Sequence, residues 1–206
     1  MTSEAAAHPR VVLVAGPPGA GKTTGSRILA RHYGWAYLDA DTMYQPMLSA
    51  LIQAAGFPAQ DRSPQTLIRA GRNPGNDALE AVIIDNVSAG VSIIATNTFR
   101  SRLSTPGWLE AFRERVAAHG GRVVVIWVSA AEPTIRERIL ARQSWRDAWK
   151  LANWDRWVVA ALRPAPRGVD AVITNDGDRS AFEEALLTAC DTLLGVSPRP
   201  QRTVLG

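Results

Sequence analysis

The sequence predicts an α/β fold: a single domain in which a parallel β-sheet is covered by helices on both faces. Short apolar segments alternate with longer amphipathic segments along the chain, and a glycine-rich turn follows the first apolar segment. This alternation is the pattern of parallel strands joined by right-handed helical crossovers. The 206 residues, 46% hydrophobic and 20% charged, are enough for one sizeable core, and no repeat or domain boundary interrupts them.

Five segments are expected to be strands. Residues 11–15 (VVLVA) are apolar at every position, as in a strand buried on both faces. The other four expected strands lie at residues 35–41, 91–96, 122–129 and 170–174.

The segments between the strands carry helical patterns. Gly90 ends one of them, Gly120 and Gly121 end another, and Pro133 stands in a first turn, where its missing N–H costs nothing. Residues 56–76, with three prolines and three arginines, are expected to be irregular at their ends. Helices are therefore predicted at 22–33, 43–55, 77–89, 108–121, 132–143 and 179–194. The domain is expected to span residues 10–195, with flexible ends at 1–9 and 196–206.

Composition limits the classes of ligand that the protein is expected to bind. The net charge of +4 permits anionic ligands. The sequence does not show the denser basic stripe that is usual in proteins that bind nucleic acid. No secretory signal and no apolar stretch of membrane-spanning length is present, so a cytoplasmic protein, a monomer or homodimer, is expected. The single cysteine, Cys190, excludes an internal disulfide and a multi-cysteine metal site, and its leucine neighbours predict a packed helix thiol.

The strongest motif is the glycine-rich turn after the first strand. Residues 16–24 (GPPGAGKTT) satisfy the pattern G-x-x-x-x-G-K-[ST]. Its backbone N–H groups and the following helix N-terminus favour phosphate oxygens. Lys22 is expected to reach the β- and γ-phosphates, and the Thr23 hydroxyl to bind Mg²⁺. The alternative is a turn that only joins strand to helix. The predicted phosphate-binding residues are Gly16, Gly19, Ala20, Gly21, Lys22, Thr23 and Thr24.

Two aspartates, Asp39 and Asp41, follow the second strand in LDADTMY. The carboxyl end of a strand in an open parallel sheet faces the ligand crevice, and residues two apart on an extended chain point the same way. We assign Asp41 as the base that accepts a proton from an attacking hydroxyl, and Asp39 as a helper of Mg²⁺ through water. The alternative is a turn whose aspartates cap a helix.

The chain resembles the P-loop small-molecule kinases, the AAA_33 group that includes gluconate and shikimate kinases and their zeta-toxin-like relatives. The resemblance rests on GPPGAGKTT, LDADTMY, GVSIIATNTFRSR, RERILARQSWRD and VITNDGD, spread from about residue 11 to 190. It implies a five-stranded sheet of order 2-3-1-4-5, a helical lid over about 138–160 and an acceptor-binding region over about 43–76. It also implies ATP with Mg²⁺ as the phosphoryl donor, with GTP left open.

One position departs from the group. Many relatives have an acidic residue at the end of the third strand, where this chain has Thr96 and Asn97. The departure gives Asp39 more weight in metal binding and makes Asn97 a candidate for contacting the substrate or metal-bound water.

Arginines suggest how the acceptor is held. Arg100 follows the third strand, and Arg69 and Arg72 lie where relatives bind their acceptor. An arginine fork binds carboxylates and phosphates bidentately, so an anionic acceptor is expected. The alternative for each is a solvated surface arginine.

The lid segment adds further cations. Arg138, Arg142, Arg146 and Lys150 recur every four residues, which predicts one basic face of a helix. By the resemblance, Arg142 and Arg146 contact phosphate during transfer and Arg138 stacks on adenine. The lid tryptophans either pack the lid to the domain or line a pocket for an aromatic or sugar-like acceptor.

The loop after the fifth strand, TNDGD, matches in position the loop that borders adenine in relatives. Asn175 and Asp176 are therefore candidates for contacting the base or ribose; a simple Asx turn is the alternative.

The function expected is transfer of the ATP γ-phosphate to a hydroxyl of a small metabolite, natural product or antibiotic. A nucleoside or nucleotide kinase, a regulatory P-loop NTPase and a nucleic-acid end kinase are the alternatives.

Overall fold

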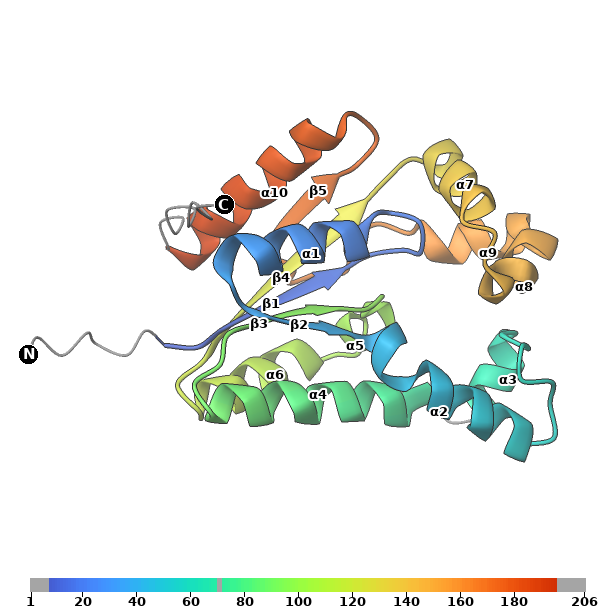
Figure 1. The fold of residues 1–206 in the computed structure, drawn as a ribbon, viewed down its shortest axis with the longest axis horizontal. Coiled ribbons are helices and arrows are strands. Elements are labelled where there is room, and N and C mark those ends of the chain that lie inside the picture. The colour runs from blue at the N-terminus through green and yellow to red at the C-terminus, as the bar shows by residue number, and fades with distance from the viewer. Residues whose placement is uncertain (1–7, 70–71, 196–206) are drawn as a thin grey trace, which may run out of the picture.

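Five parallel strands form the centre of the protein in the computed structural model (Figure 1), which describes residues 8–69 and 72–195, without the side chains of residues 68–69 and 72–74. The sheet has the order β2-β3-β1-β4-β5, as expected. The strands are β1 (Arg10–Ala15), β2 (Ala36–Asp39), β3 (Ile93–Thr96), β4 (Arg122–Ser129) and β5 (Ala171–Thr174).

The central strand β1 explains the wholly apolar segment that begins the domain. It pairs in parallel with β3 on one side and β4 on the other, for example Leu13 with Ala95 and with Val125. All five residues from Val11 to Ala15 are fully buried, because both faces of the strand are covered by helices. Successive side chains of the strand enter cores on opposite faces of the sheet.

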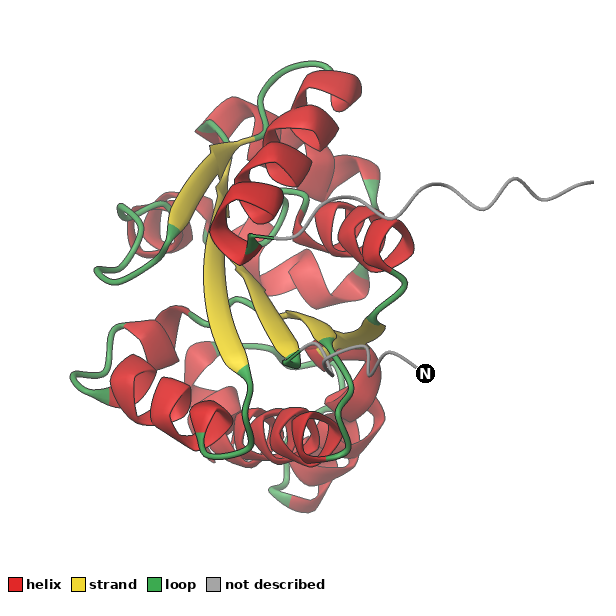
Figure 2. Ribbon diagram, turned by 90° about the vertical axis from the view of Figure 1, so that its left-hand side faces the viewer, coloured by secondary structure: helices red, strands yellow, loops and turns green. Residues whose placement is uncertain are grey.

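Helices cover the two faces separately (Figure 2). On one face, Phe182, Leu186 and Cys190 of α10 (Arg179–Leu194) pack with Leu29 of α1 (Lys22–Tyr33). Burial raises the pKa of Cys190 to about 12, which confirms a packed thiol. The opposite face is covered by α2 (Ala40–Ala54), α4 (Arg72–Ser88) and α6 (Trp108–Ala117).

The remaining short helices lie beyond the carboxyl ends of the strands, where α7–α9 face α2 and α3 (Figure 1). They are α3 (Pro64–Arg69), α5 (Arg100–Leu103), α7 (Glu132–Ala141), α8 (Ala148–Ala152) and α9 (Trp154–Ala161). A 3₁₀ turn, Trp145–Asp147, joins α7 to α8. These short helices thus surround the carboxyl ends of the strands.

The sequence placed the strands correctly but misplaced several ends. The second strand is shorter than predicted, since α2 begins at Ala40 rather than at residue 43. Helix α4 begins at Arg72, five residues before the prediction and within the end of segment 56–76 that was expected to be irregular. Helix α3 lies in the middle of that segment, for which no element was predicted. The expected flexible ends fall largely on residues 1–7 and 196–206, which lie outside the described residues; Pro9 already accepts a hydrogen bond from the Arg122 N–H (3.0 Å).

Gly16, which leaves β1, offers a test of this arrangement. Its φ of 140° is one that L side chains rarely adopt, and a Cβ there would overlap the Val128 carbonyl oxygen of β4. We expect Gly16→Ala to lower the free energy of unfolding by roughly 2–4 kcal/mol through backbone strain and overpacking, measured by urea denaturation. The control is Gly177→Ala, where a Cβ meets nothing within 4 Å. Equal free energies of unfolding for the two variants would contradict the close approach of Gly16 to the Val128 carbonyl.

Candidate functional site

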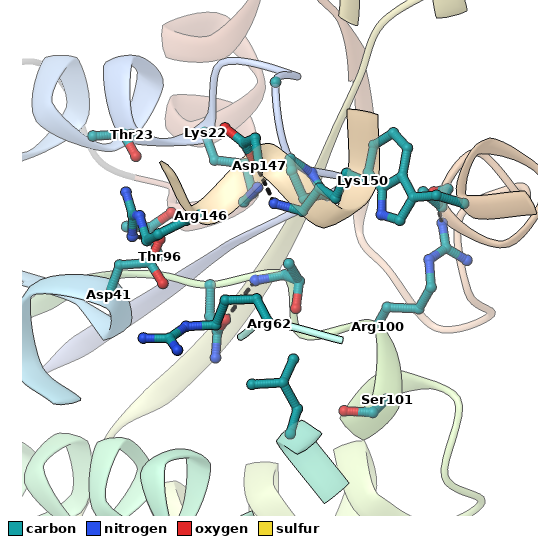
Figure 3. Close-up of a pocket in the computed structure, with 18 of the residues that line it drawn as sticks. Lys22, Thr23, Asp41, Arg62, Thr96, Arg100, Ser101, Arg146, Asp147 and Lys150 are labelled. Atoms are coloured by element: carbon teal, nitrogen blue, oxygen red, sulfur yellow. Dashed lines mark hydrogen bonds and ion pairs between the residues drawn. The ribbon is translucent and has the colours of Figure 1, made fainter. Parts of the chain in front are cut away.

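A cavity of about 770 Å³ lies at the carboxyl edge of the sheet (Figure 3). Its walls come from the loop after β1, the start of α2, the segment after β3, and the lid helices. Most of the predicted site residues line it: Gly16, Gly19, Gly21, Lys22, Thr23, Thr24, Asp39, Asp41, Asn97, Arg100, Arg138, Arg142 and Arg146. The topology therefore brings together predicted site residues from four separate parts of the sequence.

The phosphate-binding loop ends in a helix whose first N–H groups are available. Gly21 has φ 101° and is the N-cap of α1, with no side-chain cap and no acidic residue in the first turn. The first intrahelical bond of this turn runs from the Gly25 N–H to the Gly21 carbonyl (3.0 Å). Uncapped N–H groups at a helix N-terminus bind anions, so the loop has the geometry that the motif predicts.

Lys22 reaches into the cavity from this helix. Its ammonium donates to the Pro17 carbonyl (2.9 Å). Burial lowers the pKa of Lys22 to about 8; Asp41 opposes this shift, while Arg142 and Lys150 add to it. Burial is therefore the main cause of this shift, and a bound anion would favour the charged form of Lys22. The cavity is lined by more lysines and arginines than aspartates, which also suits an anion.

The lid is not the continuous helix that the four-residue spacing predicted. Helix α7 ends at Ala141, Gln143 has a φ of 46°, and Ser144 is extended before the 3₁₀ turn begins. The predicted basic helix face is therefore wrong. Arg138, Arg142, Arg146 and Lys150 nevertheless all line the cavity, because the chain folds back on itself after α7.

Asp147 explains why the chain folds back. Its carboxylate is completely buried and accepts hydrogen bonds from Arg142 (2.7 Å) and Lys150 (2.5 Å). Burial would raise the pKa of Asp147, but these hydrogen bonds outweigh it, so the pKa lies below its usual value. Asp147 was not predicted from the sequence. The available signal was its position five residues after Arg142 and three residues before Lys150.

Asp39 and Asp41 do not share an extended segment, contrary to the prediction. Asp39 ends β2 and is the N-cap of α2, and its Oδ1 accepts from the Asp41 N–H (2.9 Å). Its Oδ2 accepts from the Tyr37 hydroxyl (2.8 Å). Asp41 stands in the first turn of α2. Helix capping therefore accounts for Asp39 but not for Asp41, and both side chains line the cavity.

Asp41 connects the lid to α2. Its Oδ2 lies 2.9 Å from Arg146, and its Oδ1 accepts from Gln45 (3.1 Å). The Asp41 side chain is 57% exposed, so this ion pair is accessible to solvent and contributes little stability by itself. Figure 3 shows Asp41 and Arg146 side by side on the cavity wall.

Of the arginines expected to bind an acceptor, Arg100 has a described side chain, and this side chain is engaged with the protein. Arg100 lines the cavity but donates to the carbonyls of Ala161, Arg163 and Pro164 (2.7–3.3 Å) and lies over the Trp127 ring. The side chains of Arg69 and Arg72 lie outside the described residues.

Asn97 donates to Asn76 (2.9 Å) and accepts from the Thr98 N–H (2.7 Å). It lines the cavity at the end of β3, so its contact with substrate or water stays a prediction.

The loop after β5 supports the phosphate-binding loop from behind. Asn175 is buried and donates to the Ala20 carbonyl (2.8 Å), while Asp176 accepts from the Ala131 N–H at the start of α7 (2.6 Å). Neither residue lines the cavity, whereas Arg138 does and lies within 3.5 Å of the Gly19 carbonyl and of Asn175. Contact of these residues with a nucleotide base stays a prediction.

The tryptophans of the lid divide between the two alternatives. Trp154 is buried with Ile135 and Ile139 and donates to Glu132 (2.9 Å), so it packs the lid. Trp149 and Trp157 line the cavity. The segment therefore both holds the lid and supplies part of the cavity wall.

The oxygen groups near the loop suit Mg²⁺. Thr23 and Asp39 both line the cavity, and hydroxyl and carboxylate oxygens are hard ligands. Within residues 8–69 and 72–195 no group of three or more His, Cys, Asp or Glu residues could hold a metal by itself. The residues thus fit an ion that keeps several waters and is bound largely through phosphates.

The fold and the loop together define a P-loop nucleotide-binding domain. The chain belongs to the AAA domain family AAA_33, which it matches over residues 11–162. Among the helices of the described residues, none is long and apolar enough to cross a membrane.

Curated relatives carry kinase names. The probable gluconokinase of Mus musculus is 26% identical over 144 residues, which are 66% of this chain and 73% of that protein. The cytidylate kinase of Rhodococcus opacus (strain B4) is 31% identical over 123 residues, 56% of this chain and 54% of that protein. A cytidylate kinase of Shewanella amazonensis is 45% identical over 42 residues, 20% of this chain and only 18% of that protein. The chain thus spans less than two thirds of both cytidylate kinases.

Solved structures share the fold. A sugar kinase from Janibacter sp. HTCC2649 has a TM-score of 0.61 at 23% identity, over 93% of this chain and 99% of that chain. A gluconokinase from Sinorhizobium meliloti 1021 has a TM-score of 0.61 at 14% identity, over 91% and 95%.

The lowered pKa of Lys22 predicts proton uptake when a nucleotide binds. Because the folded pKa is about 8 and the ordinary value is 10.5, the ligand-free lysine is largely neutral near pH 9, and its contribution to stability rises with pH between these values. A bound triphosphate favours the ammonium. We therefore expect binding near pH 9 to take up a fraction of a proton approaching one, measured by calorimetry in buffers of different ionisation enthalpy. Lys22→Met should abolish the uptake; uptake that persists would contradict the assignment.

Replacement of Asp147 tests the lid ion pairs. Asp147→Asn keeps the side-chain size but leaves Arg142 and Lys150 without their buried counter-charge, so the free energy of unfolding should fall by about 2–4 kcal/mol. Adding inorganic tripolyphosphate should recover part of the melting temperature, since a polyanion replaces the lost charge. The matched control is Asp155→Asn at an exposed position of α9. A variant as stable as the control would show that the buried pairs contribute no net stability.

Proposed function

We propose that the protein transfers the γ-phosphate of ATP to a hydroxyl group of a small molecule. The observation that carries the proposal is Asp41, a carboxylate directed into the cavity that also holds Lys22 and the lid cation Arg146. A carboxylate beside a phosphate site is the group that a kinase needs and a simple nucleotide-binding protein does not. The kinase names of the relatives support the same class of reaction.

The transfer assigns a role to each group. The acceptor oxygen bonds to the γ-phosphorus while the bond from that phosphorus to the bridging oxygen of ADP breaks, and the hydroxyl proton passes to Asp41. Lys22, Arg142 and Arg146 stabilise the charge on the transferring phosphoryl group, which carries most of the catalysis in such reactions.

Arg146 has two partners in this scheme. Without ligand it pairs with Asp41 (2.9 Å). When the triphosphate is bound, Arg146 turns to the phosphoryl oxygens and leaves Asp41 free to accept the proton. Mg²⁺, when bound, neutralises phosphate charge, and Thr23 together with Asp39 through water would hold it.

A nucleotide kinase is the second candidate, favoured by the similarity to cytidylate kinases. ATP consumption measured over a panel of metabolites and antibiotics, with gluconate and CMP included, separates the two candidates. Acceptor-independent hydrolysis alone would speak against both.

Replacing Asp41 tests the general base. With the acceptor found in that panel, Asp41→Asn should lower kcat by about 10²–10⁴-fold, because the amide cannot accept the proton, while nucleotide affinity stays close to that of the wild type. Steady-state ADP formation measures the first quantity and calorimetry the second. Asp155→Asn serves as the matched control. Near-normal turnover by Asp41→Asn would remove Asp41 from the reaction.

A further inference from the structure

We infer that the acceptor is an uncharged alcohol with a flat, apolar body, rather than a compact polyol or hydroxy acid. The inference rests on the proposed phosphotransfer, since it concerns the other end of the same cavity. It replaces the anionic acceptor expected from the count of arginines.

The two ends of the cavity differ in chemistry. Lys22 and Thr23 lie at one end, and Arg100 and Ser101 lie away from them, with Arg62 between (Figure 3). Apolar side chains from α2, α3 and the lid also line the cavity, namely Tyr44, Leu48, Leu67, Trp149, Trp157 and Ala160. Trp157 and Ala160 lie on α9, whose Ala161 carbonyl accepts a hydrogen bond from Arg100, so this helix borders the second end. A ligand that occupied it would bury an apolar surface.

The aromatic part of this wall is held in place by the protein itself. Trp157 packs against Trp154, with ring centroids 5.1 Å apart, and belongs to the apolar cluster of α7 and α9. The Tyr44 ring lies against Gly75, where an added Cβ would come within 2.9 Å of it. Fixed aromatic surfaces bind flat apolar groups with little loss of conformational freedom.

Arg100 at this end and Arg62 between the two ends both donate hydrogen bonds to the protein, although the Arg62 Nε is buried without a partner among the described residues. Arg100 donates to three carbonyls, those of the last residue of α9 and of two residues that follow it. Arg62 donates to Ser49 (3.0 Å) and to the Ala59 carbonyl (2.6 Å), and lies over the Trp145 ring. An anion would have to draw these guanidinium groups from carbonyls that would then lose their donors, which is costly.

The other charged and polar side chains near this end also suit an uncharged acceptor. Arg163 is exposed at the rim, where a charge pair is screened by water. Ser101, Ser104 and Gln45 also line the cavity. Such neutral groups can both donate to and accept from one or two hydroxyls on an apolar body.

Binding of matched probes tests the inference independently of turnover. In the presence of ADP and Mg²⁺, we expect saturable binding of 2-phenyl-1,3-propanediol by the full chain, at least tenfold tighter than gluconate or glycerol, measured by calorimetry. Trp157→Ala should weaken the aryl diol by about tenfold through loss of an aromatic contact. Val159→Ala is the matched control, since Val159 lies on the same helix and is 70% exposed. Trp149→Ala, outside that apolar cluster, gives a second variant if Trp157→Ala fails to fold.

The outcomes separate the inference from the proposed function. Tighter binding of gluconate or glycerol than of the aryl diol, or no saturable binding of the diol, would overturn the inference even if ATP is turned over with another alcohol. Equal loss of diol affinity in Val159→Ala would overturn it as well. Saturable diol binding that depends on Trp157 or Trp149 supports the inference. If such binding is seen but no alcohol in the panel increases ADP formation, the proposed phosphotransfer fails while the apolar binding site stands.

Discussion

Mutual repulsion among cations around one cavity is the constraint on which the rest of the site depends. Lys22 comes from the phosphate-binding loop, and Arg146 and Lys150 come from the lid, yet all three line the same space. The protein holds them together by placing Asp147 beneath Lys150 and Asp41 opposite Arg146. The compensation is incomplete, because eight lysines and arginines of the described chain line the cavity against three aspartates. Burial adds to the cost of the charge on Lys22 and lowers its pKa to about 8. A bound polyanion completes the compensation, so the same imbalance that costs stability provides affinity.

The local patterns of the sequence were sufficient for the sheet and the phosphate-binding loop. Strands such as Val11–Ala15 are apolar throughout because helices cover both faces, and that property is visible in the residues themselves. The strand order followed from the resemblance to a kinase family and not from the residues. The ends of elements were less certain, since Asp39 both ends β2 and caps α2, and a capping role depends on backbone geometry that a two-residue spacing does not determine.

The contacts that could not be predicted join residues far apart or depend on burial. Arg100 was expected to face an acceptor, but the carbonyls that hold it are 61 to 64 residues away. In the lid, the four-residue spacing predicted that the basic residues lie on one face of a helix. They do line one cavity, but because the chain turns back at Gln143 and not because it continues as a helix. What distinguishes the two arrangements is the burial of Asp147. The sequence marks this residue only by its basic neighbours five positions before and three positions after it, a pattern that does not determine burial.

The end of β3 bears on the choice between phosphate transfer and hydrolysis. Thr96 donates to the Val14 carbonyl (3.3 Å), and Asn97 donates to Asn76 (2.9 Å), so this edge connects the sheet to α4 and provides no carboxylate. A role of Asp39 in metal binding, through water, is part of the proposal. Burial, and then the hydrogen bond to Asp39, raise the pKa of Tyr37, so this phenol stays a donor and fixes the carboxylate. In the proposed transfer the proton passes to Asp41, whose side chain is 57% exposed and lines the cavity. This arrangement favours transfer to an alcohol over a motor-type or regulatory ATPase.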